Sequence, residues 1–216
     1  MTTTNGPSQR SRERNVRGQG DRLREEVLEA LARLVSDDAR MAPLPVSLRE
    51  VAREAGVTAP AIYRHFATKE ELGEAAVADG FARLLAAMRE ADARARAADD
   101  DPAAALAAQA HAYCRFAGEH RGQFRLMLRW IVPGASGEGA AALAAQWRAA
   151  VERLRERGIE LTQDEDDAAT FVWASVHGRL ALDPTLSAVW PRSAGSGMTE
   201  FVDRLVASLV AVARRR

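Results

Sequence analysis

The segment from Ser47 to Phe66 carries the residues whose types and spacing point most directly to a chemical task. Its apolar positions are Leu48, Val51, Ala52, Ala55, Val57, Ile62 and Phe66. These positions predict two short helices, over 48–54 and 59–65, that cross over a small shared core. Gly56 lies between them, at a turn where a positive φ angle costs glycine no strain. Two short helices joined in this way form a helix-turn-helix, which places its second helix in the major groove of DNA.

The predicted second helix turns small and polar side chains outward. Thr58 can donate a hydrogen bond to a phosphate or a base edge, and an alanine can contact a thymine methyl group. Tyr63 and His65 carry donors for phosphate oxygens, and Lys69 starts the next helix beside unpaired backbone N–H groups. The predicted DNA contacts of this region are Ser47, Thr58, Ala59, Pro60, Ala61, Tyr63, Arg64, His65 and Lys69. The alternative is a plain helical hairpin, which would not need this set of donors around a glycine turn.

Residues 1–20 are polar and contain four arginines but one acidic residue, Glu13. Two interpretations stay open for this segment. It is either a solvated tail or a basic arm that lies on phosphates or in a minor groove. In the second case Arg14 and Arg17 are predicted DNA contacts.

The composition favours an all-helical protein that acts inside the cell. Aromatic residues make up 6% of the 216, and few windows alternate with period two. The formal net charge is +0, so DNA binding has to depend on local charge placement. A single cysteine, Cys114, excludes an internal disulfide and a cysteine-based metal site, and we expect it to be a small buried residue. The N-terminus has no apolar signal core and no later run is long enough to span a bilayer, so we expect a cytoplasmic protein.

Helical periodicity divides the chain into about nine helices. They are expected over 21–36, 48–54, 59–65, a long helix from Thr68 through Met88, 102–118, 121–131, 138–157, 163–182 and 198–213. The long helix begins directly after the helix-turn-helix, so the two parts of the protein should be joined rigidly.

Capping residues, glycine and proline indicate where the predicted helices begin and end. Three helix starts have the spacing of a capping box: Ser47 with Glu50, Thr68 with Glu71, and Thr162 with Glu165. Gly158 directly follows the helix predicted over 138–157, in the position that a helix-ending glycine takes. Pro184 and Pro191 indicate a loop from Asp183 to Gly197.

The region from Ser47 to Leu72 resembles the tetracycline-repressor (TetR) family. The similarity lies in Leu48-Arg49-Glu50-Val51-Ala52, Ala55-Gly56-Val57, Tyr63-Arg64-His65-Phe66 and Lys69-Glu70-Glu71-Leu72. The resemblance implies a three-helix DNA-binding domain, a C-terminal domain for ligand binding and dimerisation, and usually repression. We therefore predict an arm over 1–20, a DNA-binding domain over 21–72 and a ligand-binding and dimerisation domain over 73–216. The stretch from Asp37 to Val46, with two prolines, is longer than is usual in the family.

The C-terminal part concentrates aromatic and sulfur side chains. Core packing is the default explanation for each of them, but as a set they could line an apolar cavity for a small hydrophobic effector. The predicted pocket residues are His111, Tyr113, Phe116, Phe124, Met127, Trp130, Trp147, Phe171, Trp173 and His177. Trp173 and His177 share a helix face and precede Gly178, which resembles the Trp-xxx-His-Gly element of one TetR-like subgroup. For His177 alone, a satisfied and partly buried histidine is the competing interpretation.

A homodimer is expected because one recognition helix binds weakly, whereas two on a twofold axis read two half-sites. The helices over 163–182 and 198–213 are the interface candidates. The predicted interface residues are Val176, Gly178, Leu180, Phe201, Leu205 and Leu209. The alternative is that the apolar stripe of the last helix packs only within its own bundle.

The sequence gives less support to other functions. The four histidines show no metal-ligand spacing, and the acidic run from Asp164 to Asp167 suits a helix N-terminus, so we predict neither an enzyme nor a cofactor. The main alternative is a helical DNA-binding or protein-interaction module that responds to no ligand.

Overall fold

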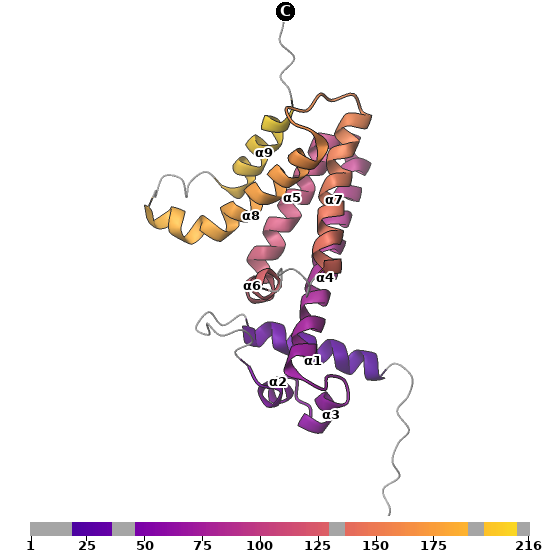
Figure 1. Cartoon of the computed structure of the whole chain (residues 1–216), viewed down its shortest axis with the longest axis vertical. Helices are drawn as coiled ribbons and strands as arrows, with labels where there is room; N and C mark the ends of the chain where they lie inside the picture. The colour runs from indigo at the N-terminus through magenta and orange to yellow at the C-terminus, as the bar shows by residue number, and fades with distance from the viewer. Residues whose placement is uncertain (1–18, 36–45, 130–136, 190–196, 211–216) are drawn as a thin grey trace, which may run out of the picture.

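The computed structural model describes residues 19–35, 46–129, 137–189 and 197–210, and within them it consists of nine α-helices (Figure 1). The helices are α1 (Gln19–Val35), α2 (Leu48–Glu54), α3 (Ala59–Tyr63), α4 (Lys69–Ala98), α5 (Pro102–Glu119), α6 (Arg121–Arg129), α7 (Gly137–Glu156), α8 (Glu165–Val189) and α9 (Met198–Leu209). The predicted all-helical class and helix number are confirmed for these residues.

The long helix α4 joins the two parts of the molecule. Helices α1 to α3 gather around its first turns, and α5 to α9 form a bundle along its remainder (Figure 1). At 1.5 Å per residue, its 30 residues span about 45 Å. The rigid connection expected from the sequence is present.

Two glycines let helices approach α4 closely. A Cβ atom at Gly80 of α4 would lie 2.6 Å from the sulfur of Met127 on α6. A Cβ atom at Gly139 of α7 would lie 2.5 Å from the ring of Phe81 on α4. Such distances are too short for real contacts, so a larger residue at either position would displace the Met127 side chain or the Phe81 ring. They fix α6 and α7 against the helix that carries the helix-turn-helix.

A buried carboxylate ties the C-terminal half of α4 to the bundle. Asp92 is 6% exposed, and its Oδ1 accepts hydrogen bonds from Arg153 of α7 at 2.7 Å and from Gln109 of α5 at 2.9 Å. Arg96 approaches Oδ2 at 3.1 Å, and the Gln109 amide oxygen accepts from Gln146 of α7 at 2.7 Å. One acidic side chain therefore links three helices.

The predicted capping boxes have three different outcomes. Ser47 and Glu50 form the complete box, with the Glu50 backbone N–H donating to Ser47 Oγ and the Ser47 N–H donating to the Glu50 carboxylate. Thr68 accepts from the Glu71 N–H at 3.1 Å, but the Glu71 carboxylate accepts from Ala67. The second box is therefore only half formed, and its carboxylate binds one residue further back.

The box predicted for Thr162 and Glu165 is wrong. Helix α8 begins later, and Asp164 accepts a hydrogen bond from the Asp167 N–H at 2.9 Å. Thr162 instead donates its backbone N–H to Leu209 at the end of α9, at 2.9 Å. A contact between segments almost fifty residues apart thus replaces the local cap.

The predicted loop from Asp183 begins too early, because α8 continues to Val189. Pro184 removes one backbone donor from the helix, which costs a hydrogen bond but does not by itself end the helix. Helix α3 is shorter than expected and ends at Tyr63, with Arg64 as its C-cap residue. Most of the Asp37 to Val46 stretch lies outside the described residues, and Val46 itself is buried.

Candidate nucleic-acid interface and effector site

A small shared core holds the helix-turn-helix together. Val51 of α2, Ile62 of α3 and Phe66 after α3 are each at most 1% exposed. The guanidinium of Arg24 on α1 lies 5.5 Å from the centre of the Phe66 ring, a cation–π contact. Packing against α2, together with the contact of Phe66 with α1, therefore holds a helix only five residues long.

The turn between α2 and α3 depends on Gly56, whose φ angle is +68°. Its N–H donates to the Arg53 carbonyl at 3.2 Å, and the N–H of Val57 donates to the Ala52 carbonyl at 2.9 Å. This pair of bonds is a Schellman motif, which ends a helix with a left-handed residue. The turn that the sequence predicts is present in this form.

Helix α3 and its two cap residues expose four of the predicted contact residues: Thr58, Pro60, Tyr63 and Arg64. Tyr63 is 51% exposed, and Pro60 and Arg64 are also exposed. Thr58 is the N-cap residue by its backbone angles, yet its side chain makes no capping hydrogen bond. Its exposed hydroxyl is therefore not used by the helix.

The remaining predicted DNA contacts fall into three groups. Ala59, Ala61, His65 and Lys69 are half-buried at the margin of the exposed face. Ser47 is exposed, but its hydroxyl is engaged in the capping box. Arg14 and Arg17 lie outside the described residues.

Some charged side chains near the helix-turn-helix are engaged within the protein and others are not. Glu54 pairs with Arg33 of α1 at 2.8 Å, and Glu50 is held in its capping box. By contrast, Arg64 and Lys69 make no ion pair within the part of the chain that the structure describes. A surface with uncommitted cations and donors suits a polyanion, although the whole chain is neutral.

The sequence analysis missed two basic residues of α2. Arg49 and Arg53 are both exposed, lie four residues apart on one face of α2, and also lack an ion pair among the described residues. Their spacing could have been noticed in the sequence, because the apolar residues Leu48, Val51 and Ala52 already assign the opposite face to the core.

Two family models match the chain. The model described as "Bacterial regulatory proteins, tetR family" matches residues 43–76, and the model described as "Tetracyclin repressor-like, C-terminal domain" matches residues 106–209. Together they cover more than half of the sequence, at both of its structural parts. The chain belongs to the tetracycline-repressor family. TetR proteins are transcriptional regulators that bind operator DNA, and they are not enzymes.

Solved structures share the fold of this TetR protein along nearly their whole length. A protein of unknown function from Rhodococcus sp. RHA1 is 27% identical with a TM-score of 0.72, covering 93% of this chain and 99% of its own. The TetR regulator PfmR from Thermus thermophilus is 22% identical with a TM-score of 0.62, covering 88% and 99%. The regulator FadR from Bacillus subtilis, solved with stearoyl-CoA, is 13% identical with a TM-score of 0.66, covering 87% and 97%.

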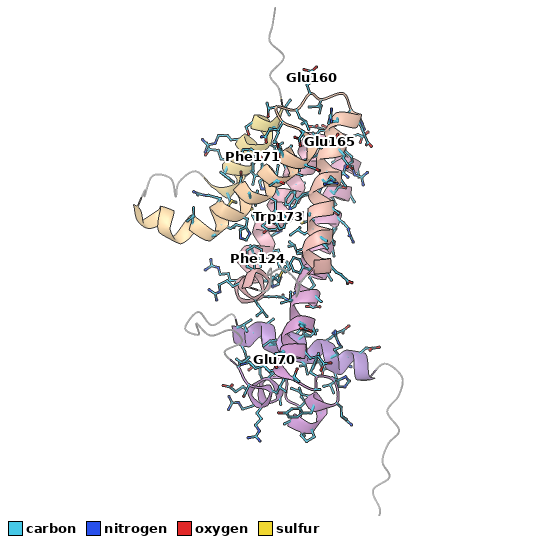
Figure 2. The ribbon with its side chains drawn as sticks, in the orientation of Figure 1. Glu70, Phe124, Glu160, Glu165, Phe171 and Trp173 are labelled. Atoms are coloured by element: carbon cyan, nitrogen blue, oxygen red, sulfur yellow. The ribbon has the colours of Figure 1, made fainter. Side chains whose placement is uncertain are left out.

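Half of the ten predicted pocket residues of this TetR protein fill the bundle core. Tyr113 packs edge-on against Phe124, with ring centres 5.5 Å apart, and lies 5.8 Å from Trp147. The residues that are at most 7% exposed are Tyr113, Phe116, Phe124, Met127 and Trp147. Core packing, the default explanation, accounts for these five. Figure 2 labels Phe124 and Trp173 within the bundle, above the helix-turn-helix end marked by Glu70.

Trp173 and His177 both reach the hydroxyl of Tyr113. The indole N–H of Trp173 donates to Tyr113 Oη at 3.4 Å, and His177 Nδ1 lies 2.9 Å from the same oxygen. An indole N–H can only donate, so the Tyr113 hydroxyl accepts from Trp173. The hydroxyl can then donate its own hydrogen bond to Nδ1 of His177, which places the imidazole proton on Nε2. Burial lowers the pKa of His177 below 6.5, which favours this neutral form. His177 is thus a satisfied, half-buried histidine, and it also lines a hollow of about 290 Å³ with Trp173, Leu128 and Ala174.

A larger groove of about 580 Å³ runs between α7 and α8. Alanines line much of it, Trp147 and Trp173 contribute indole rings, and an ion pair of 2.6 Å between Arg148 and Asp166 lies at its border. The indole nitrogen of Trp147 is buried and has no hydrogen-bond partner within the described residues. The groove therefore offers apolar surface, with the unpartnered indole nitrogen of Trp147 buried in its wall.

Three predicted pocket residues lie elsewhere or cannot be placed. His111 is half-buried, with Nε2 3.5 Å from a carboxylate oxygen of Asp203 on α9. Phe171 is 38% exposed on the outer side of α8. Trp130 lies outside the described residues.

The predicted interface residues divide by burial. Val176, Leu205 and Leu209 are at most 6% exposed within the chain's own bundle, so packing inside the bundle accounts for these three. Gly178, Leu180 and Phe201 are half-exposed. A continuous outward strip follows α8 instead, at helical spacing, through Phe171, Ala174, Gly178 and Leu182.

Neither a metal site nor a membrane-spanning helix is found within the ranges that the structure describes. No group of three or more acidic, histidine or cysteine residues could hold a metal ion there. No helix in those ranges is long and apolar enough to cross a membrane.

Proposed function

We propose that this TetR protein is a homodimeric repressor that leaves its operator when a small hydrophobic effector binds. The observation that carries the DNA-binding role is the exposed face of α3, where Thr58, Tyr63 and Arg64 hold donors that the described protein does not use. We assign DNA contact to that face, which also includes Pro60, with Ala59, Ala61, His65 and Lys69 at its margin. Arg14 and Arg17 of a basic arm are proposed to add phosphate contacts, and we propose that the protein acts in the cytoplasm.

The proposed domains follow the sequence boundaries: an arm over 1–20, DNA binding over 21–72, and effector binding with dimerisation over 73–216. TetR regulators act as dimers. We place the dimer contact on the outward strip of α8, which includes Gly178, together with Leu180 of the same helix and Phe201 of α9, because exposed apolar side chains favour association. We also propose membership of the Trp-xxx-His-Gly subgroup, on the pairing of Trp173 and His177 with Tyr113.

The effector is proposed to lie in the groove between α7 and α8, in contact with Trp147 and Trp173. An apolar ligand with one hydrogen-bond acceptor would suit the alanine surface and the unused indole N–H of Trp147. FadR, which shares this fold, was crystallised with stearoyl-CoA, so the fold can hold a ligand with a long apolar chain. Release requires the ligand to prefer the conformation that does not bind DNA, by a coupling of about 1–3 kcal/mol or more.

Operator binding should depend on Tyr63 and Lys69. Genomic fragments selected by the purified protein supply the operator, and fluorescence anisotropy then compares variants on it. Tyr63→Ala and Lys69→Ala should each weaken binding about tenfold, because each removes a contact to a charged phosphate. Lys69→Ala should also reduce the salt slope by about 0.9. Unchanged affinity in both folded variants would remove the role assigned to this face.

Two dyes test the indole donor in the groove. Anilinonaphthalene sulfonate carries an acceptor, whereas N-phenylnaphthylamine has a similar aromatic skeleton without the sulfonate. Trp147→Phe should weaken binding of the sulfonate dye about tenfold and leave the affinity for the neutral dye nearly unchanged, because only the sulfonate dye loses a hydrogen bond. Fluorescence titration measures both affinities, and thermal melting checks the fold. Equal losses for the two dyes would show that Trp147 contributes packing alone.

A further inference from the structure

We infer that α3 reads its operator through the methyl groups of thymines, with Pro60 as the residue that contacts them. The inference rests on the proposed operator binding and names the kind of base that this face selects. The N-terminal part of a recognition helix is the part that meets base edges in the major groove. In this chain that part runs from Thr58 through Ala61, so its side chains decide which bases are recognised.

Pro60 points away from the protein core. Ile62, two positions later, is 0% exposed and packs into that core. At 3.6 residues per turn, side chains two positions apart lie about 160° apart around a helix. Pro60 is accordingly exposed, whereas Ala59 and Ala61 on either side of it are half-buried. The pyrrolidine ring is therefore the apolar group that the start of α3 presents most fully to a duplex.

The start of α3 lacks the side chains that read guanine or adenine. Those bases are recognised by paired hydrogen bonds from arginine, lysine, asparagine or glutamine. Positions 58–61 hold a threonine, two alanines and a proline, and the first guanidinium, that of Arg64, follows the last residue of the helix. A threonine hydroxyl bonds to several kinds of base edge and selects none of them strongly. The group that an apolar turn can select in the major groove is the C5 methyl of thymine.

Hydrogen-bond donors are grouped beyond the start of α3. Tyr63, the last residue of the helix, is 51% exposed, Arg64 is its C-cap residue, and Lys69 begins α4. Contacts from such donors to phosphates fix the register of a protein on DNA but carry no sequence information directly. These donors would hold the apolar turn in the groove, and the choice between bases then depends on the methyl contact.

The test replaces thymine by deoxyuridine, one position at a time, in an operator selected by the full-length protein. Uracil keeps the hydrogen-bonding groups of thymine and lacks only the methyl group. At least one replacement in each half-site should weaken binding about fourfold, the effect of exposing one buried methyl-sized group. A duplex with 5-methylcytosine at that position should bind better than one with cytosine, because it restores a methyl group at the same place. Fluorescence anisotropy measures each affinity.

Pro60→Ala tests which side chain meets the methyl group. In this variant the loss caused by uracil should fall below about twofold, because the partner of the methyl group has already been removed. Pro102→Ala makes the same substitution in the first turn of α5, outside the helix-turn-helix, and should leave the loss caused by uracil unchanged. Thermal melting confirms that both variants are folded.

Three results would overturn the inference. Equal affinity for thymine and uracil at every position would show that no methyl group is read, while operator binding itself would stand. A loss caused by uracil that is the same in Pro60→Ala as in the natural chain would place the methyl contact on another residue. A protein that selects no duplex at all would remove the proposed function, and this inference with it.

Discussion

Replacing Asp92 with alanine should lower the free energy of unfolding by about 3 kcal/mol. The substitution removes a carboxylate that is 6% exposed and leaves Arg153 and Gln109 without their shared acceptor. Losing one member of a buried ion pair costs about 3–5 kcal/mol, and the lower value applies because the Arg153 side chain retains 26% exposure. Urea denaturation at a fixed protein concentration measures the change, since dimer formation makes stability depend on concentration.

The matched control is Glu90→Ala on the same helix. Glu90 approaches Arg94 at 3.5 Å, but both side chains are about two-thirds exposed. An exposed pair of this kind contributes about 0–1 kcal/mol. Equal destabilisation by Asp92→Ala and Glu90→Ala would show that the link between α4, α5 and α7 adds nothing beyond an ordinary surface charge.

Reversing the charge of Arg64 should weaken operator binding about a hundredfold. Arg64 is exposed at the end of α3 and has no ion-pair partner within the described residues, so Arg64→Glu should leave the fold unchanged. In the complex the new carboxylate would face phosphates, and like charges brought together cost several kcal/mol. Anisotropy on the selected operator measures the affinity, and thermal melting confirms the fold.

Arg115→Glu provides the comparison for that variant. Arg115 is exposed on α5, far along the chain from the helix-turn-helix, and the change in net charge is the same. Its operator affinity should fall only by the small amount that a distant charge produces under screening. If both variants lose affinity equally, the α3 face has no special role.

The parts of the fold that the sequence predicts depend on near neighbours. The turn at Gly56 and the cap at Ser47 each involve residues within five positions of one another. Local periodicity and capping preferences are enough to place such features. The same reasoning failed at Thr162, because its backbone N–H bonds to Leu209, which no local pattern indicates.

The sequence could not predict those features of the candidate sites that depend on contacts between helices far apart in the chain. The spacing of Trp173 and His177 places them on one helix face, but only the packing of α5 against α8 shows that Tyr113 lies between their polar atoms. In the same way, sequence periodicity marks Trp147 as apolar and cannot show that its indole N–H is left without a partner among the described residues. Depth of burial also distinguishes Leu205 and Leu209 in the core from the outward strip of α8.

The most direct test of DNA contact is alkylation of a cysteine placed on α3. The only natural cysteine, Cys114, is buried, and burial raises its pKa to about 12, so it should react slowly with iodoacetamide. In Ala61→Cys the new thiol lies at the margin of the proposed contact face, and in Ala86→Cys it lies on the exposed side of α4. A saturating amount of operator duplex should slow alkylation at position 61 at least about tenfold and leave position 86 unchanged. Unchanged alkylation at position 61 while the duplex is bound would contradict the placement of α3 against DNA.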